Sequence, residues 1–215
     1  MKVIIDDKEI TCKPGQTVLE VALENNIDIP TMCFNPLFGK HHSGACRVCL
    51  VEVLMGGKIG MEPACNLAVA EGLTISTKNE KVYDARRTML ELLLSEHVQD
   101  CRNCPSSGNC NLARLCRDYD INGVPVCAEC PNQKEACLLT KKILCLGPVT
   151  YANCGAYCTR MGERCEGCHS VLFNRDVLGF AAKAYKENGI AMEDVIRSCQ
   201  IFSFEKSKNL EGLRK

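Results

Sequence analysis

The densest group of possible metal ligands in the chain is the stretch HVQDCRNCPSSGNC, residues 97–110. It places His97, Cys101, Cys104 and Cys110 close together, with a proline and a glycine between them. Imidazole nitrogen and thiolate sulfur are ligands for zinc and for iron–sulfur clusters, so the residue types alone allow a zinc site with three cysteines and one histidine, or a cluster. The choice depends on the elements that carry this stretch.

Thiols are abundant in the rest of the chain. Cysteine accounts for 18 of the 215 residues, whereas aromatic residues make up only 5% and tryptophan is absent. The N-terminus MKVIIDDKEITC lacks the basic head and apolar core of a signal peptide, and no apolar run is long enough to span a bilayer. We therefore expect a cytoplasmic protein, in which so many thiols indicate metal binding rather than disulfides.

Charge gives little indication of partners. The 26 basic and 26 acidic residues cancel, and no basic tract stands out. Attraction by bulk charge to nucleic acid or to an anionic membrane is therefore not expected.

A second ligand group lies nearer the N-terminus, where Cys33, Cys46, Cys49 and Cys65 have the spacing C-x12-C-x2-C-x15-C. Four thiolates are the usual ligands of a [2Fe–2S] cluster, and the glycine in SGACRVC lets the backbone pass close to the inorganic core. The alternative is a four-cysteine zinc site, but zinc modules of this kind usually contain two C-x2-C pairs. We expect His41 and His42 to be solvated loop residues, because four cysteines already complete the site.

A small α+β fold is expected to carry this site. The runs KVIID and KEITC flank a hairpin turn at Asp6-Asp7, and CRVCLVEVL and LTISTK are further strand candidates. A helix is expected to begin after Thr17, with Glu20 completing a capping box, and to end at Asn25-Asn26. Its inward-facing residues are expected to be Val18, Leu19, Val21 and Ala22. The prediction is a mixed sheet with one helix across it.

The stretch PTMCFNPLFGKHHSGACRVCLVEV…EPACNLAV resembles the β-grasp ferredoxin domain at the start of the large subunit of NADH:quinone oxidoreductase and its relatives in NAD-linked hydrogenases. A one-histidine, three-cysteine [4Fe–4S] site follows that domain in those proteins, and residues 97–110 resemble it. The resemblance implies that His97, Cys101, Cys104 and Cys110 hold a [4Fe–4S] cluster. A neutral imidazole in place of a thiolate would make this cluster less negative and ease its reduction.

An amphipathic helix is predicted between Glu80 and Glu96, just before this site. We expect it to be a packing helix with Arg86, Arg87 and Glu91 away from its inner face. The residues expected on that inner face are Val82, Ala85, Met89, Leu92 and Leu93.

Residues 127–168 contain eight cysteines, the number that two all-cysteine [4Fe–4S] clusters require. The residues alone allow a sequential or an interleaved division. The segment resembles the C-terminal part of the small subunit of methyl-viologen-reducing and sulfhydrogenase-type [NiFe] hydrogenases, and this resemblance favours the sequential division. One cluster would then have Cys127, Cys130, Cys137 and Cys145 as ligands, and the next would have Cys154, Cys158, Cys165 and Cys168. The flavodoxin-like domain of that subunit is missing from this sequence, so we do not expect docking to a nickel site.

The predicted organisation is a β-grasp [2Fe–2S] domain over residues 1–78, a one-histidine, three-cysteine [4Fe–4S] domain over 79–120, a two-cluster domain over 121–170 and a helical segment over 171–215. The last segment contains the helical runs VLGFAAKAYKENG and AMEDVIRSCQIF, followed by a polar tail expected to fray. Cys12, Cys116 and Cys199 are interpreted as thiols without a ligand role.

No nucleophile–base pair, flavin motif or GxGxxG appears, so no catalytic residue is expected, and FMN or FAD and NAD(P) are expected on partner subunits. One [2Fe–2S] and three [4Fe–4S] clusters indicate an electron-transfer subunit of a multi-subunit NAD(P)H-linked oxidoreductase. Expected partners are a flavin-containing NADH-binding subunit like that of complex I, a second flavin or hydrogenase subunit, and ferredoxin.

The N-terminal part of the sequence resembles a complex I subunit, and the C-terminal cysteine-rich part resembles a hydrogenase subunit. This combination suggests an electron-bifurcating, ferredoxin-dependent NADH:NADP transhydrogenase. A close alternative is the diaphorase-side linker of a cytoplasmic hydrogenase. An alternative of another class is a zinc-organised interaction or nucleic-acid module, against which the neutral charge and the few aromatics argue.

Overall fold

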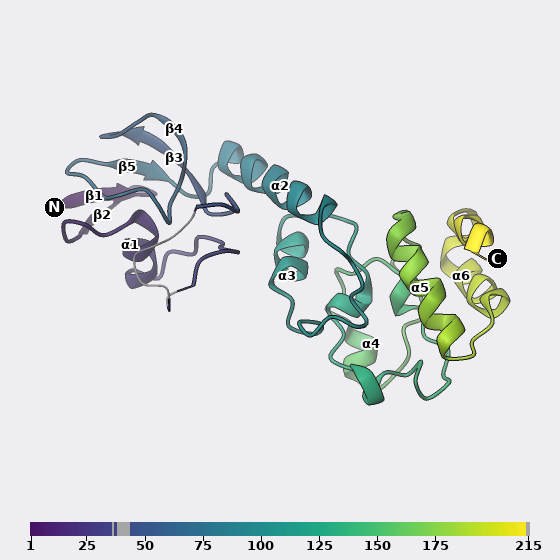
Figure 1. Cartoon of the computed structure of the whole chain (residues 1–215). Coiled ribbons are helices and arrows are strands. Elements are labelled where there is room, and N and C mark those ends of the chain that lie inside the picture. The colour runs from purple at the N-terminus through teal and green to yellow at the C-terminus, as the bar shows by residue number, and fades with distance from the viewer. Residues whose placement is uncertain (36, 38–43, 214–215) are drawn as a thin grey trace. The chain divides into compact units, whose positions relative to one another are not determined.

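The computed structural model describes residues 1–35, 37 and 44–213, so His41 and His42 lie outside the described residues (Figure 1). The chain forms two compact units, Met1–Ser95 and Glu96–Lys215. The α+β class is confirmed, because a sheet occurs in the first unit and short helices and loops make up the second. The finer division into four domains stays a prediction.

The sheet of the first unit has five strands, and its order is β2-β1-β5-β3-β4. The central pair β1 and β5 is parallel, while β1–β2, β3–β4 and β3–β5 are antiparallel. The strand bounds are β1 Lys2–Ile5, β2 Lys8–Thr11, β3 Leu50–Met55, β4 Gly60–Pro63 and β5 Thr74–Ser76. Strand β4 has glycine and proline at its ends, and the strand pattern of the sequence did not predict it.

Local sequence signals explain the first hairpin and the first helix. Asp6 and Asp7 have φ of 48° and 67°, the left-handed conformation that a two-residue hairpin turn requires. Thr17 and Glu20 form the predicted capping box at the start of α1 (Val18–Glu24). The four apolar residues predicted to face inward, Val18, Leu19, Val21 and Ala22, are all buried, and they pack in one core with Val3, Ile5, Val51, Val53 and Ile75.

Helix α2 (Glu80–Ser95) forms as predicted, and Val82 is buried as expected, but the predicted inner face is otherwise only partly right. The buried side chains are Val82, Arg86, Leu90 and Leu94, a stripe with a spacing of four residues, while Leu92 is 58% exposed. Arg86 was expected to lie away from the inner face. It is buried because its Nε donates a hydrogen bond to the carbonyl oxygen of Leu50, at 2.8 Å, at the start of β3.

The second unit is built from short helices joined by loops and from two longer helices, α5 with 13 residues and α6 with 16. Their bounds are α3 Asn111–Asp118, η2 Val126–Ala128, η3 Lys134–Ala136, η4 Gly147–Val149, α4 Tyr157–Arg160, α5 Arg175–Glu187, α6 Met192–Ser207 and η5 Lys208–Leu213. The core joins loop residues such as Leu146 and Leu172 to α5 and α6, with Tyr185 fully buried. Gly189, with φ of 69°, separates the two predicted helices.

The C-terminal tail is more ordered than predicted. Helix α6 runs to Ser207 and η5 continues to Leu213. The expected frayed end is therefore wrong up to this point, because Leu210 is completely buried and anchors η5 in the core.

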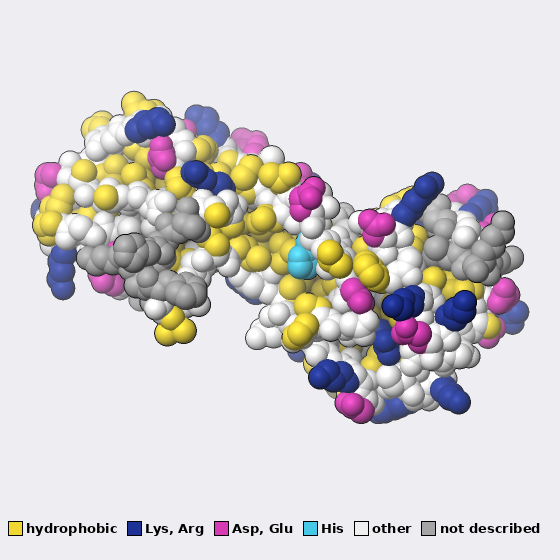
Figure 2. All heavy atoms as spheres, in the orientation of Figure 1, with side chains coloured by type: hydrophobic (Ala, Val, Ile, Leu, Met, Phe, Trp, Pro, Cys, Tyr) yellow, Lys and Arg dark blue, Asp and Glu magenta, His cyan; other side chains and the backbone are white. Residues whose placement is uncertain are grey.

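Two surface properties bear on function. On the face shown in Figure 2, basic and acidic side chains are interspersed, in keeping with the zero net charge. Among the described residues, none of the helices combines the length and the apolar character needed to cross a membrane.

The observed face of α2 can be tested with two leucines of the same helix. Replacing the buried Leu90 with alanine should lower the free energy of unfolding by about 2–5 kcal/mol, through lost burial and the cavity left behind. Leu92→Ala should cost less than about 1 kcal/mol because that side chain is exposed. Anaerobic denaturant titration followed by circular dichroism measures both, and equal costs would contradict the observed face.

Candidate iron–sulfur centres

The first cysteine set is positioned by the sheet and by the loop before it. Cys49 directly precedes β3 and Cys65 follows β4, and the Ala64 N–H donates to the Cys49 carbonyl at 3.0 Å. The β3–β4 hairpin therefore explains the fifteen residues between Cys49 and Cys65, because it returns the chain to the end of the hairpin at which β3 begins. Cys33 is exposed, Cys46 half-buried, and Cys49 and Cys65 are buried.

The structure brings these four thiols together. Burial, and then the charge of Cys49, raise the pKa of Cys65 to about 12, with smaller contributions from Cys33 and Cys46. Burial also raises the pKa of Cys46, although backbone N–H groups of Val48 and Cys33 lower it. Four thiols that interact in this way form a donor set of the type that a [2Fe–2S] cluster takes.

Gly44 is required by the loop that carries Cys46. Its φ is 60°, and a Cβ at this position would lie 2.8 Å from Nδ2 of Asn66. The close neighbour of this glycine is thus the residue after Cys65. The glycine lets the loop approach the end of β4, and the predicted close passage of this loop to the inorganic core stays a prediction.

The second set is carried by a turn-rich loop that ends at α3. Cys101 is buried, and Cys104 and Cys110 are half-buried. Burial raises the pKa of Cys101 to about 12, and the charges of Cys110 and Cys104 add to this effect, so these three thiols are neighbours. Cys110 is also the N-cap of α3, where its Sγ accepts a hydrogen bond from the Ala113 N–H at 3.5 Å.

His97 and Cys116 occupy different environments beside this set. His97 is exposed, and its imidazole is not among the groups that shift the pKa of Cys101. Its role as a ligand stays a prediction. Cys116 is buried, and burial followed by the charge of Cys110 raises its pKa to about 12.

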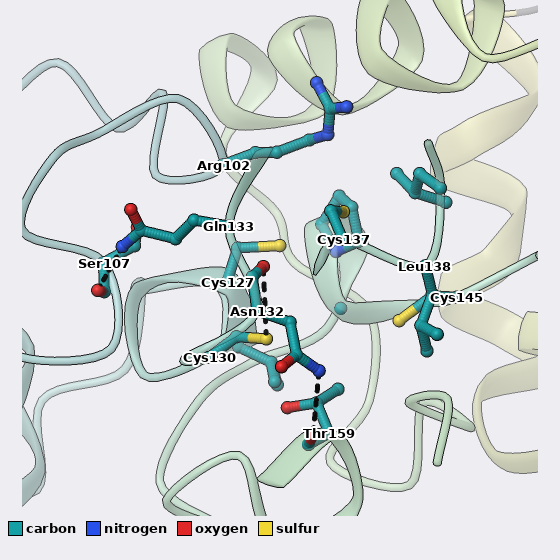
Figure 3. A pocket seen from close by; sticks show the side chains of 14 residues that line it. Arg102, Ser107, Cys127, Cys130, Asn132, Gln133, Cys137, Leu138, Cys145 and Thr159 are labelled. Atoms are coloured by element: carbon teal, nitrogen blue, oxygen red, sulfur yellow. Dashed lines mark hydrogen bonds between the residues drawn. The ribbon is translucent and has the colours of Figure 1, made fainter. Parts of the chain in front are cut away.

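The third set lines one cavity. Cys127, Cys130, Cys137 and Cys145 all contribute to its wall, and Figure 3 shows the sulfur atoms of Cys127 and Cys130 pointing toward that of Cys145. Burial, followed by the charge of Cys145, raises the pKa of Cys127 well above its usual range. The cavity volume is about 30 Å³, and the four thiols form part of its wall.

Gly147 lies beside this cavity. A Cβ on Gly147 would lie 3.5 Å from the Cys127 sulfur and 3.7 Å from the Cys145 sulfur, which are ordinary contact distances. The backbone at Gly147 is therefore a neighbour of two thiols of the third set.

The fourth set has two less exposed and two exposed cysteines. Cys165 is buried and Cys154 half-buried, and the charge of Cys154 is one of the causes that raise the pKa of Cys165 to about 12, after burial and the charge of Cys145. Cys158 on α4 and Cys168 after Gly167 are exposed. The structure thus brings Cys154 and Cys165 together and leaves the exposed pair at the surface.

Adjacent sets within the second unit approach one another. The backbone N–H of Cys165 donates a hydrogen bond to the sulfur of Cys145, at 3.3 Å, in a buried position. The charge of Cys101 contributes to the raised pKa of Cys127, so the second and third sets are also neighbours.

Several residues that support these thiols were not singled out from the sequence. Asn132 donates from Nδ2 to the Thr159 carbonyl at 2.8 Å, and Gln133 donates from Nε2 to the Ser107 carbonyl, so both amides fix the loop after Cys130 (Figure 3). The buried Tyr185 hydroxyl donates to the Cys145 carbonyl at 2.9 Å. The position of Asn132 and Gln133 shortly after Cys130 could have indicated their role in the sequence. No residue near Tyr185 in the sequence indicates that it contacts a cysteine.

The donor sets consist almost entirely of thiols, the usual ligands of iron–sulfur clusters. In the described part of the chain, no group of three or more His, Cys, Asp or Glu side chains is arranged to hold a single metal ion. Thiols with pKa near 12 are protonated at neutral pH, so metal binding must displace protons from Cys65, Cys101 and Cys165.

Comparisons with known families agree with the first two sets. Residues 1–80 match a 2Fe-2S iron–sulfur cluster binding domain, and residues 86–125 match the NADH-ubiquinone oxidoreductase-G iron–sulfur binding region. The resemblance stated for this part of the chain is confirmed. Residues 127–168 lie beyond both matches, so their likeness to a hydrogenase small subunit stays a prediction.

Similar proteins come from NAD(P)-linked complexes. The chain is 38% identical over 128 residues to NADP-reducing hydrogenase subunit HndD of Solidesulfovibrio fructosivorans, covering 58% of this chain and 22% of that protein. It is 34% identical over 121 residues to NAD-reducing hydrogenase HoxS subunit gamma of Cupriavidus necator, covering 56% and 49%. The matched region therefore spans half of these relatives or less.

A solved structure is similar over the same share of the chain. It is the crystal structure of NAD+-reducing [NiFe]-hydrogenase in the H2-reduced state, with 36% sequence identity and a TM-score of 0.50. The match covers 55% of this chain and 48% of that chain.

The ligand role of His97 can be tested by substitution. His97→Cys should retain a cluster but lower its midpoint potential, because a thiolate adds negative charge where the imidazole is neutral. His97→Ala should lose that cluster or leave it labile. Redox-poised EPR measures both variants, and a His97→Cys protein with every signal at its original midpoint would show that His97 is not a ligand.

Proposed function

We propose that the chain is the iron–sulfur electron-transfer subunit of a multi-subunit NAD(P)H-linked flavin oxidoreductase. The ligands would be Cys33, Cys46, Cys49 and Cys65 for one [2Fe–2S] cluster; His97, Cys101, Cys104 and Cys110 for a [4Fe–4S] cluster; Cys127, Cys130, Cys137 and Cys145 for a second; and Cys154, Cys158, Cys165 and Cys168 for a third. When bound, these clusters would accept and release single electrons.

The observation that carries this proposal is the contact between successive cysteine sets. The Cys165 N–H to Cys145 sulfur hydrogen bond connects a residue of the last set to one of the set before it. Cys101 and Cys127 are near enough for their charges to interact. Cysteine sets placed side by side suit stepwise passage of electrons, whereas independent structural metal sites have no need to be neighbours.

The protein would tune this relay through burial and hydrogen bonds to sulfur. Cys101, Cys145 and Cys165 are buried, which keeps water away from their sulfur atoms. Backbone N–H groups donate hydrogen bonds to the sulfurs of Cys110 and Cys145, and bonds of this kind tune the potential of a bound cluster. Tyr185, whose pKa is raised well above its usual range by burial, stays protonated and fixes the Cys145 carbonyl.

The flavin and the nicotinamide nucleotide would belong to partner subunits. The sequence contains no glycine-rich dinucleotide motif, and the relatives it matches are subunits of NAD(P)-linked hydrogenases. The proposed partners are a flavin-containing NADH-binding subunit like that of complex I and a second flavin or hydrogenase subunit. A cytoplasmic location is part of the proposal.

Two finer functions follow from the two resemblances. We propose an electron-bifurcating, ferredoxin-dependent NADH:NADP transhydrogenase, on the basis of the complex-I-type first half and the eight cysteines of the second half. The second candidate is the diaphorase-side linker of a hydrogenase, which the similarity to an NAD+-reducing [NiFe]-hydrogenase structure supports.

The proposal is tested by anaerobic reduction of the purified chain and of its native complex. The chain alone should be reduced by dithionite but not by NADH, because it has no flavin site to split a hydride into single electrons. In the native complex, NADH should bleach the visible absorption of the clusters.

The native complex also distinguishes the transhydrogenase from the hydrogenase linker. Hydrogen should reduce the complex only if the chain is a hydrogenase linker, and NADP+ reduction that requires both NADH and reduced ferredoxin should occur only if the complex bifurcates. Reduction of the chain alone by NADH, or a native complex in which NADH bleaches no cluster absorption, would refute the relay function.

A further inference from the structure

A polar hollow of about 400 Å³ lies on the second unit, next to two of the cysteine sets. Its wall includes Cys110 of the second set and Ala128 and Glu129 from the loop between Cys127 and Cys130. The Gly108 N–H donates to the Ala128 carbonyl at 2.9 Å, which joins the two sides of the wall.

Basic side chains outnumber acidic ones in this hollow. Three arginines line it, Arg114 and Arg117 from α3 and Arg160 from the end of α4, against one carboxylate, that of Glu129. Glu129 is buried and pairs with Arg117 at 3.0 Å, so these two charges offset each other. Asp118, the residue after Arg117, pairs with Arg114 at 3.1 Å, so three arginines and two carboxylates leave one net positive charge.

The arginines are held in place rather than mobile. Arg160 donates from Nε to the Gly155 carbonyl at 2.6 Å and from Nη2 to the Glu129 carbonyl at 3.1 Å. Arg114 and Arg117 remain 52% and 38% exposed, so their unused N–H groups face solvent. Fixed guanidinium groups suit recognition of carboxylates, since little side-chain entropy is lost on binding.

The residue types that line the hollow also indicate whether a complex formed there would be permanent or transient. It contains no Leu, Ile, Val, Met or aromatic side chain; the lining residues are Gly108, Asn109, Cys110, Asn111, Arg114, Arg117, Ala128, Glu129 and Arg160. Obligate interfaces bury apolar surface, whereas weak electron-transfer encounters are small and polar. A polar, arginine-lined surface therefore suits a partner that binds briefly and leaves.

We propose that this hollow is the docking site of a small acidic electron-carrier protein, whose carboxylates contact Arg114, Arg117 and Arg160. The inference rests on the proposed function for its meaning. Docking places the carrier beside the wall formed by Cys110 and the 127–130 loop, so that one electron leaves the carrier and one enters the chain, with no bond made or broken.

Binding of an acidic [4Fe–4S] ferredoxin to the cluster-loaded chain tests the proposal, by calorimetry at low and at high salt. In the unchanged protein the Kd should rise with salt. Arg114→Glu should raise the Kd about tenfold at low salt and much less at high salt, because it reverses one charge in the hollow. Asn109→Asp should raise it about threefold, by adding a negative charge at an exposed lining residue.

A matched control is available on α2. Arg87 pairs with Glu91 four residues on at 3.0 Å, with exposure close to that of Arg114 and Asp118. Arg87→Glu removes an equivalent surface ion pair and makes the same change in net charge, but it should leave the Kd within about twofold. Iron content and the circular dichroism spectrum verify that each variant is folded.

Three results would overturn the proposal. The first two are an equal rise in Kd for Arg87→Glu and Arg114→Glu, and a Kd for ferredoxin that does not depend on salt. The third is displacement of ferredoxin by low concentrations of inorganic pyrophosphate, which would indicate a small-oxyanion site. Because the readout is affinity, it is independent of whether NADH reduces the complex. A failure of docking and a failure of the relay function are therefore distinguishable.

Discussion

The burial of thiol groups is the constraint on which the second unit depends. Its helices before α5 have at most eight residues, and Cys101, Cys130, Cys145 and Cys165 are buried in the segments between them and in loops. A buried thiol resists ionisation, as the raised pKa values of Cys101 and Cys165 show, yet metal binding requires the thiolate. Metal coordination would overcome that cost and cross-link loops that carry little regular structure. On this account the clusters stabilise the fold of the second unit as well as carrying electrons. Metal cross-links would then supply stability that a core with few aromatic residues does not.

The first unit places its ligands in a different way. A sheet with a capped helix supplies an ordinary apolar core of Val, Ile, Leu and Ala side chains, and Cys49 and Cys65 sit where the β3–β4 hairpin starts and ends. Backbone hydrogen bonds of the sheet thus set the spacing of two ligands, and Gly44 allows the loop that carries Cys46 to approach. In the second unit the corresponding work is done by side chains such as Asn132 and Tyr185, which bind loop carbonyls.

The sequence predicted those features of the fold that depend on residues close together in the chain. The hairpin at Asp6-Asp7, the capping box at Thr17 and the break at Gly189 each depend on neighbouring residues, and all three are confirmed. The inner face of α2 was predicted only in part, because Arg86 looks like a surface residue until the Leu50 carbonyl, far away in sequence, supplies its partner. Strand β4 and the burial of Leu210 were missed for the same reason, since tertiary contacts decide them. Cysteine spacing indicated the first ligand set, and the family resemblances implied the other three, but the contacts between sets, such as Cys165 with Cys145, depend on the fold.

The central claim is that cysteines and one histidine of this chain hold iron–sulfur clusters rather than zinc. The most direct measurement is metal and acid-labile sulfide analysis of protein purified without oxygen, together with its visible spectrum. One [2Fe–2S] and three [4Fe–4S] clusters require about fourteen iron and about fourteen sulfide per chain, with a brown colour that dithionite bleaches. A colourless protein that contains mainly zinc and no labile sulfide would contradict the account.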